Sequence, residues 1–317
     1  MPATSIGSPL LWGGFGLLVL IMLALDLGVF HRKAHAVSVK EAFVWSMVWI
    51  GLSCLFGIGL LFYAGSTASG EFFAGYLIEK ALSVDNIFVF VMIFTAFKVP
   101  AIYQHRVLFW GILGALIMRA IFIGLGAVLI ARFHWIMYFF GALLVYTAAK
   151  LMLAKEDEFH AEDNRLYRFF RKVVPATPDY EGQAFFVNRG RRLATPLFFV
   201  LVLVEITDLI FAVDSIPAVF AVTQDPFLVY TSNIFAILGL RSLYFLLAGV
   251  VERFYYLKPA LAVILGFVGV KMLIVDLYKI PISLSLGFIG GALVIAVIFS
   301  VRRDRKINAK PTSLTGH

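Results

Sequence analysis

Two stretches decide the fold of this chain: FFAGYLIEKALSVDNIFVFVMIFTAF at residues 72–97 and PLFFVLVLVEITDLIFAVDSIPAVFAV at residues 196–222. Each is long enough to cross the hydrocarbon core of a bilayer as a helix, which takes about 20 residues. An ionised carboxylate at bilayer depth costs roughly 2.5–3.5 kcal/mol on insertion scales, so acids at that depth are functional candidates. The two stretches contain five such carboxylates: Glu79, Asp85, Glu205, Asp208 and Asp214.

The whole chain has the composition of a membrane protein. Hydrophobic residues make up 61% of it and the mean hydropathy is +0.93, which excludes an ordinary soluble domain. We therefore predict an all-α, polytopic membrane bundle in contact with the lipid bilayer. About nine transmembrane helices are expected, at residues 9–30, 41–64, 72–97, 107–131, 135–154, 196–222, 227–250, 259–278 and 281–300.

The positive charges lie where topology signals lie in membrane proteins. The formal net charge is +8, but Lys and Arg gather in alternate short loops and in the tail after residue 300, with eight of them in the 155–193 loop. This pattern is not that of a nucleic-acid-binding face. The positive-inside rule instead places the N-terminus outside and the C-terminus in the cytoplasm.

The order of charged residues within the spans predicts an internal repeat. When LSVDNIFVF is aligned with FAVDSIPAV, Asp85 falls on Asp214 and Glu79 falls on Asp208. Each repeat has three spans, an odd number, so the second copy would cross the membrane inverted, as in many secondary transporters. The later spans then align through Arg119 with Arg241 and through Lys150 with Lys271. The expected segments are two N-terminal helices (1–64), repeat 1 (72–154), a cytoplasmic loop (155–193), repeat 2 (196–278), and a last helix with a basic tail (281–317).

The carboxylates predict a cation site where the two repeats meet. Residues six apart on a helix are turned by ~240° and separated by ~9 Å along the axis, so Glu79 and Asp85 cannot hold one ion together. The simplest site takes one principal acid from each repeat, Asp85 and Asp214, joined by Asn86 and Ser215. Pro217 would also leave the Val213 carbonyl free beside this site. Further acids would help ions or protons to enter and leave: Glu79, Asp208 and Glu205.

The chemistry of the candidate ligands limits which ions the site would bind. Carboxylate, amide, hydroxyl and carbonyl oxygens suit Mn²⁺, Mg²⁺ or Ca²⁺, and the oxygen ligands do not separate these three. All six histidines fall in loops or at their edges, and Cys54 is the single cysteine. Soft metals and CxxC redox chemistry are therefore disfavoured.

A structural alternative stands beside the ion site. The acids could be neutralised by cations from the spans, and the ion pairs would then hold the bundle together. Lys80 and Arg119 could also act as tethered cations that exchange with the substrate. The charge-compensating candidates are Lys80, Arg119, Lys150, Arg241 and Lys271.

At the acidic segments the chain resembles the TerC family of integral membrane proteins. EKALSVDNIFV at 79–89 and EITDLIFAVDSIPA at 205–218 are similar to its two signature segments, and the flanks resemble the longer, nine-span Alx-type members. The resemblance implies efflux of a divalent metal, manganese foremost, across the bacterial inner membrane. It also implies a transporter with no cofactor and no enzymatic activity. The positions that match are Glu79, Asp85, Asn86, Glu205, Asp208, Asp214 and Ser215.

Other functions attached to this family remain alternatives. One is membrane-bound redox modulation and another is tellurium resistance, although an acidic pocket repels the tellurite oxyanion. A third is delivery of metal to secreted enzymes, or help with their assembly, which would use the same site. Proton coupling and the oligomeric state stay open at this point.

Overall fold

The protein is described here from a computed structural model that covers all 317 residues. The described backbone excludes 1–4, 29–37, 134, 154–173, 249–254 and 309–317, and the described side chains also exclude 25–28, 85 and 304–308. The described part is mostly helical. In chain order its elements are α1 (Pro9–Gly28), α2 (Val39–Ala96), α3 (Ala101–Arg132), α4 (Ile136–Leu153), β1 (Phe186–Asn188), β2 (Arg192–Ala194), α6 (Pro196–Phe220), α7 (Pro226–Leu238), α8 (Leu240–Leu247), α9 (Leu257–Leu273) and α10 (Ile282–Asn308).

Helix α2 folds back on itself at Gly65. This residue has φ 88° and ψ 177°, outside the helical region, and the residues on either side of it are helical. Ser69 Oγ donates to the Gly57 carbonyl at 2.8 Å. A straight helix would separate these residues by about 18 Å, so the chain reverses between them. Two predicted spans, 41–64 and 72–97, are therefore the two arms of α2. The loop expected at 65–71 is wrong, because a single glycine makes the turn.

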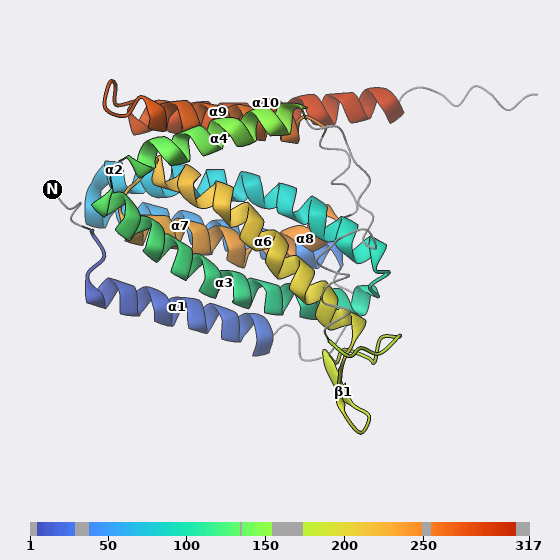
Figure 1. The fold of residues 1–317 in the computed structure, drawn as a ribbon. Coiled ribbons are helices and arrows are strands. Elements are labelled where there is room, and N and C mark those ends of the chain that lie inside the picture. The colour runs from blue at the N-terminus through green and yellow to red at the C-terminus, as the bar shows by residue number, and fades with distance from the viewer. Residues whose placement is uncertain (1–4, 29–37, 134, 154–173, 249–254, 309–317) are drawn as a thin grey trace, which may run out of the picture.

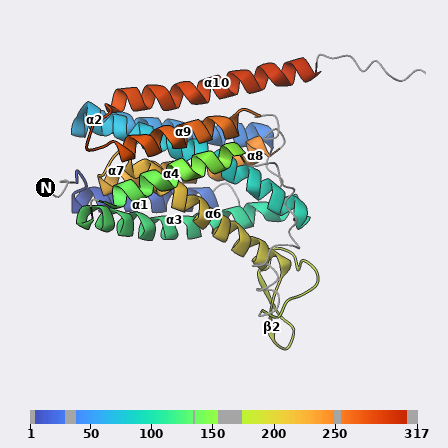
Figure 2. The same cartoon turned by 45° about the horizontal axis from the view of Figure 1, so that its top comes forward.

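The helices lie in layers (Figures 1 and 2). The second arm of α2 packs with α6, α7 and α8, and α3 covers α6 and α7. Helices α4 and α9 pack on each other along one side, and α10 contacts both α9 and α2. On the other side, α1 contacts α7 through aromatic rings, with Trp12 and Phe227 centroids 5.1 Å apart. The layers leave many large apolar side chains on the outer surface, including Leu10 and Phe62, each 85% exposed.

Six described helices are long and apolar enough to cross a membrane, and α2 is counted once among them. They establish a polytopic helical membrane architecture, whereas the number of nine spans remains a prediction. One expected span, 227–250, corresponds to α7 and α8 together, which are interrupted at Gly239 and count as one of the six. Several helix ends also differ: α3 begins at Ala101 and not at 107, and α9 ends at Leu273, before the predicted residue 278.

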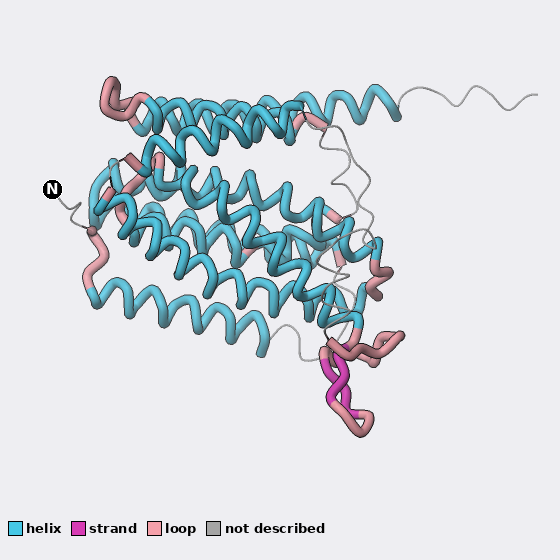
Figure 3. Tube along the Cα trace, in the orientation of Figure 1, coloured by secondary structure: helices cyan, strands magenta, loops and turns pink. Residues whose placement is uncertain are grey.

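A small β-hairpin was not predicted (Figure 3). Strands β1 and β2 pair antiparallel, with Val187 opposite Leu193, and Gly190 at the turn has φ 78°. Tyr180 Oη donates to the Phe97 carbonyl at 2.8 Å, which ties this segment to the end of α2. The cytoplasmic loop predicted at 155–193 is described only from residue 174 onward.

Candidate functional site

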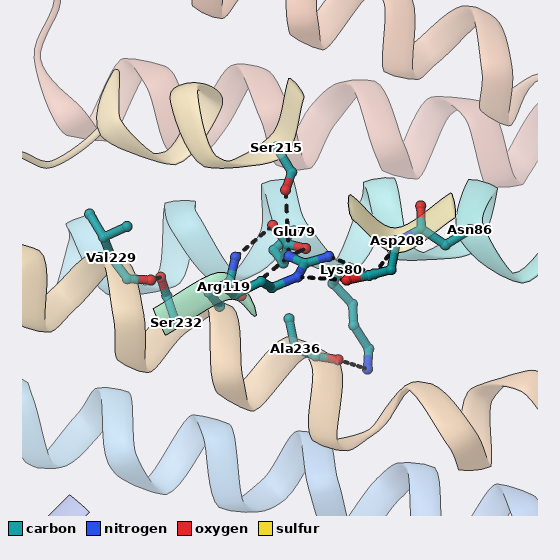
Figure 4. A network of polar contacts seen from close by, with 10 residues as sticks. Glu79, Lys80, Asn86, Arg119, Asp208, Ser215, Val229, Ser232 and Ala236 are labelled. Carbon is teal, nitrogen blue, oxygen red and sulfur yellow. Dashed lines mark hydrogen bonds and ion pairs between the residues drawn. The ribbon is translucent and has the colours of Figure 1, made fainter. Parts of the chain in front are cut away.

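Arg119 forms the centre of a buried polar network between four helices (Figure 4). It lies on α3 and its side chain is fully buried. Nη2 donates to Asp208 Oδ1 on α6 at 3.0 Å, and Nε donates to Asp208 Oδ2 at 3.3 Å. Nη1 forms an ion pair with Glu79 on α2. Charge-assisted, bidentate contacts of this kind are among the strongest hydrogen bonds in proteins.

Neutral polar side chains complete the network. Asn233 on α7 accepts from Arg119 Nη1 at 3.2 Å and donates from Nδ2 to Glu79 Oε2 at 3.0 Å. Ser215 Oγ accepts from the same guanidinium at 3.5 Å. Asn86 Nδ2 donates to Asp208 at 3.5 Å, while Asn86 Oδ1 is buried without a hydrogen-bond partner among the described residues. Asn86 thus keeps an unused acceptor oxygen inside the bundle, which is costly unless a ligand engages it.

A cavity of about 200 Å³ adjoins this network. It lies between the α2–α6 pair and the α4–α9 pair, and its walls combine oxygen ligands with apolar side chains. Four of the seven predicted ion ligands line it, namely Glu79, Asn86, Asp214 and Ser215, together with Thr147 and Lys150.

Asp214 faces α4 in this cavity. Thr147 Oγ1 donates to Asp214 Oδ1 at 3.0 Å, so one oxygen of the carboxylate is fixed by a neighbouring helix. Lys150 lies one turn further along α4 and is exposed. The bond from Thr147 to Asp214 joins the layer of α4 and α9 to the central helices.

The other predicted acids lie elsewhere. Asp85 lies in α2, but its side chain is outside the described part of the structure. The Glu205 carboxylate lies against Gly114 on α3, and its Oε2 is buried without a hydrogen bond to the described residues. Asp208 borders a much smaller apolar pocket of about 10 Å³ on the far side of the network. Pro217 lies inside α6, which continues to Phe220.

The remaining basic candidates are spread over three places. Lys80 Nζ donates to the Ala236 carbonyl of α7 at 3.3 Å. Lys271 Nζ donates to Ser285 Oγ on α10 at 3.1 Å, away from the network. Arg241 is buried in α8.

The described carboxylates do not converge on one point. No group of three or more described His, Cys, Asp and Glu side chains is arranged to hold a metal ion. Glu79 and Asp208 are instead bridged by Arg119, and Asp214 stands separately in the cavity. Any cation in the cavity would therefore also need the amide and hydroxyl oxygens there, from Asn86, Ser215 and Thr147.

Sequence reasoning did not identify Asn233 and Thr147. Both are uncharged polar residues within predicted spans, and such residues often serve only to bind neighbouring helices. Asn233 carried the stronger signal, because a buried amide in a span requires partners for several polar atoms.

Comparison with known proteins places these residues in a family. The profile described as "Integral membrane protein TerC family" matches residues 64–308, which include both acidic segments. The chain belongs to the TerC family. As a TerC protein it is a multi-pass integral membrane protein, in agreement with its apolar helices.

Similar TerC proteins occur in several bacteria. An "Uncharacterized membrane protein STKORF319" of Myxococcus xanthus is 55% identical over 302 residues, covering 95% of each chain. Proteins named "Putative membrane-bound redox modulator Alx" are 53% identical in Escherichia coli K12, over 93% of this chain and 95% of that one, and 50% identical in Salmonella typhi, over 96% and 99%. No solved structure matches the chain.

Proposed function

We propose that this TerC protein exports a divalent metal cation, most favourably Mn²⁺, from the bacterial cytoplasm across the inner membrane. The observation that carries the proposal is the cavity of about 200 Å³ lined by oxygen ligands from three helices. Asn86 adds a buried acceptor without a partner among the described residues, which a cation would satisfy. Carboxylate, amide and hydroxyl oxygens are the ligands that Mn²⁺, Mg²⁺ and Ca²⁺ accept.

The charges around the cavity favour a cation. The charged side chains that line it are two carboxylates (Glu79 and Asp214) and one cation (Lys150), which sum to −1 when all are ionised. An oxyanion such as tellurite would meet this negative field and be repelled. The ligands proposed to touch the ion are Glu79, Asn86, Asp214 and Ser215, with Asp85 on the same helix as a further acid.

The packing of α4 on α9 supports the inverted repeat that such a transporter would use. A Cβ built on Gly141 would lie 3.0 Å from the Gly269 carbonyl, and one built on Gly266 would lie 3.7 Å from Ala148. Residue numbers rise on α4 as they fall on α9, so the two helices run antiparallel. Antiparallel packing of two helices aligned as counterparts is expected of repeats with opposite orientations in the membrane.

Redox modulation, the activity in the name of several relatives, has less support. Thiol chemistry within one chain needs two cysteines, and this sequence has only Cys54. Metal delivery to secreted enzymes would use the same cavity and is the second candidate. It predicts release of the ion to an outside acceptor protein, whereas export needs none.

Metal flux by purified protein in liposomes tests the proposal. We expect Mn²⁺ to cross the liposome membrane without any partner protein, and Zn²⁺ and Cu⁺ to cross far more slowly. The Cys54→Ser variant serves as the redox control and should retain full flux. Absence of Mn²⁺ flux, or its loss in Cys54→Ser, would contradict metal export as proposed.

A further inference from the structure

Three of the described basic candidates are held in very different ways. Arg119 binds four acceptor side chains and is fully buried. Lys80 is bound to the Ala236 carbonyl. Lys150, by contrast, is exposed and makes no hydrogen bond or ion pair with any described residue. Only Lys150 can change its position without breaking such a bond.

Lys150 also occupies a particular place. It lines the cavity together with Asp214, yet no ion pair within 4.0 Å joins these two side chains. Because it is both exposed and part of the cavity wall, Lys150 marks the mouth of the cavity. Its flexible stem lets the ammonium group reach inward along the apolar wall of Leu151 or outward toward the end of α4, three residues further on.

Charges of like sign in one small cavity exclude each other. A divalent ion bound to Asp214 and Glu79 would lie within a few ångströms of the Lys150 stem, in surroundings of low dielectric constant. The ammonium group would have to turn outward when the ion binds, and it could turn inward again when the ion leaves. Arg119 cannot do this, because moving it would leave two buried carboxylates unpaired.

We propose that Lys150 is a tethered competitor of the transported cation, which weakens ion binding and speeds ion release from the cavity. This inference rests on the proposed export of a divalent cation through the same site. Lys150 then sets the affinity for the transported cation and the rate of its release, and it is not a member of a structural ion pair. The sequence suggested Lys80 and Arg119 as tethered cations that exchange with the substrate, and we assign this role to Lys150 instead.

Equilibrium Mn²⁺ binding to purified protein, together with Mn²⁺ flux in liposomes, tests this role. Lys150→Met removes the charge and keeps an unbranched apolar stem, so it should bind Mn²⁺ about tenfold more tightly or better. Its maximal flux should fall, because release becomes slower. Lys150→Arg keeps the charge and should bind Mn²⁺ as the unmodified protein does. High salt should reduce the difference in Mn²⁺ affinity between Lys150→Met and the unmodified protein, because Lys150 is exposed and its charge can be screened.

Lys279→Met is the matched control, because it removes the same charge from an exposed position outside the cavity. It should leave Mn²⁺ affinity unchanged. The role of Lys150 is overturned if Lys150→Met binds Mn²⁺ no more tightly than the unmodified protein, or if Lys279→Met tightens binding equally. Failure of the unmodified protein itself to bind and move Mn²⁺ would overturn the export function instead, so the two failures are distinguishable.

Discussion

At the scale of single residues, Asp208 and Asp214 have different surroundings although they lie six residues apart on α6. Asp208 is buried and is bound twice by Arg119. Asp214 is half-buried, lines the cavity, and accepts from Thr147. The alternative of structural ion pairing therefore applies to Asp208, whereas Asp214 is left to the proposed ion site.

Replacement of each aspartate by asparagine should separate these two roles. Asp214→Asn should abolish Mn²⁺ flux while the amount of folded protein in the membrane stays near normal, because no buried cation loses its partner. Asp208→Asn should lower folded protein, since removal of one partner from a buried ion pair costs about 3–5 kcal/mol. Membrane abundance and thermal unfolding of both variants provide the measurement. An abundant and fully active Asp214→Asn protein would rule out the site.

The candidate site could be predicted from the sequence only in part. Charged residues in apolar spans are conspicuous, which is why Glu79, Asp208 and Arg119 were all identified. Their pairing was not predictable, because it depends on which faces of α2, α3 and α6 meet. The same is true of Thr147, whose importance comes from the approach of α4 to Asp214.

At the scale of elements, the reversal of α2 depends on one residue. Gly65 has φ 88° and ψ 177°, a region of backbone space that is essentially restricted to glycine. Nothing lies within 4 Å of a Cβ built there, so a substitution would suffer backbone strain and no steric clash.

Gly65→Ala should destabilise the protein by about 1–3 kcal/mol for this reason. Gly59→Ala is the matched control, because Gly59 lies in the first arm with ordinary helical geometry and open space around it. Thermal unfolding in detergent should show a lower midpoint for Gly65→Ala and an unchanged or higher midpoint for Gly59→Ala. Equal midpoints for the two variants would mean that the turn tolerates a side chain.

The contact of α4 with α9 gives a second prediction at this scale. A Cβ on Gly269 would lie 2.8 Å from the Gly141 carbonyl and 2.9 Å from the Val145 nitrogen, both backbone atoms that cannot rotate away. Gly269→Ala should therefore push the helices apart and destabilise the protein by about 1–3 kcal/mol. Gly124→Ala, on α3 with open space around it, should not lower the midpoint of thermal unfolding. A Gly269→Ala protein as stable as Gly124→Ala would refute this account of the packing.

Sequence patterns predicted the helices well, and they predicted the turns and connections between them poorly. Apolar length identified α1, α4, α6 and α10 to within a few residues at most ends. It could not distinguish a loop from a one-residue turn at Gly65, because GSTASG suits both. The hairpin of β1 and β2 was missed because three-residue strands leave too short a pattern to recognise.

At the scale of the whole molecule, the loop charges predict which ends of the helices face the cytoplasm. The turn between α9 and α10 should lie outside, and the tip of the β-hairpin should lie inside. A reporter that is active only outside the cytoplasm should work when fused after Lys279 and be silent when fused after Gly190. The opposite result would reverse the orientation that the loop charges predict.

The closed turn of α2 has a consequence for how the protein enters the membrane. No Asp, Glu, Lys, Arg or His occurs between residues 42 and 70, so the first arm beyond its first turn and the reversal at Gly65 carry no charge. Carrying a short uncharged turn across the hydrocarbon costs little compared with carrying a charged loop. The two arms of α2 can therefore enter the bilayer together as one hairpin, without a charged loop to carry across.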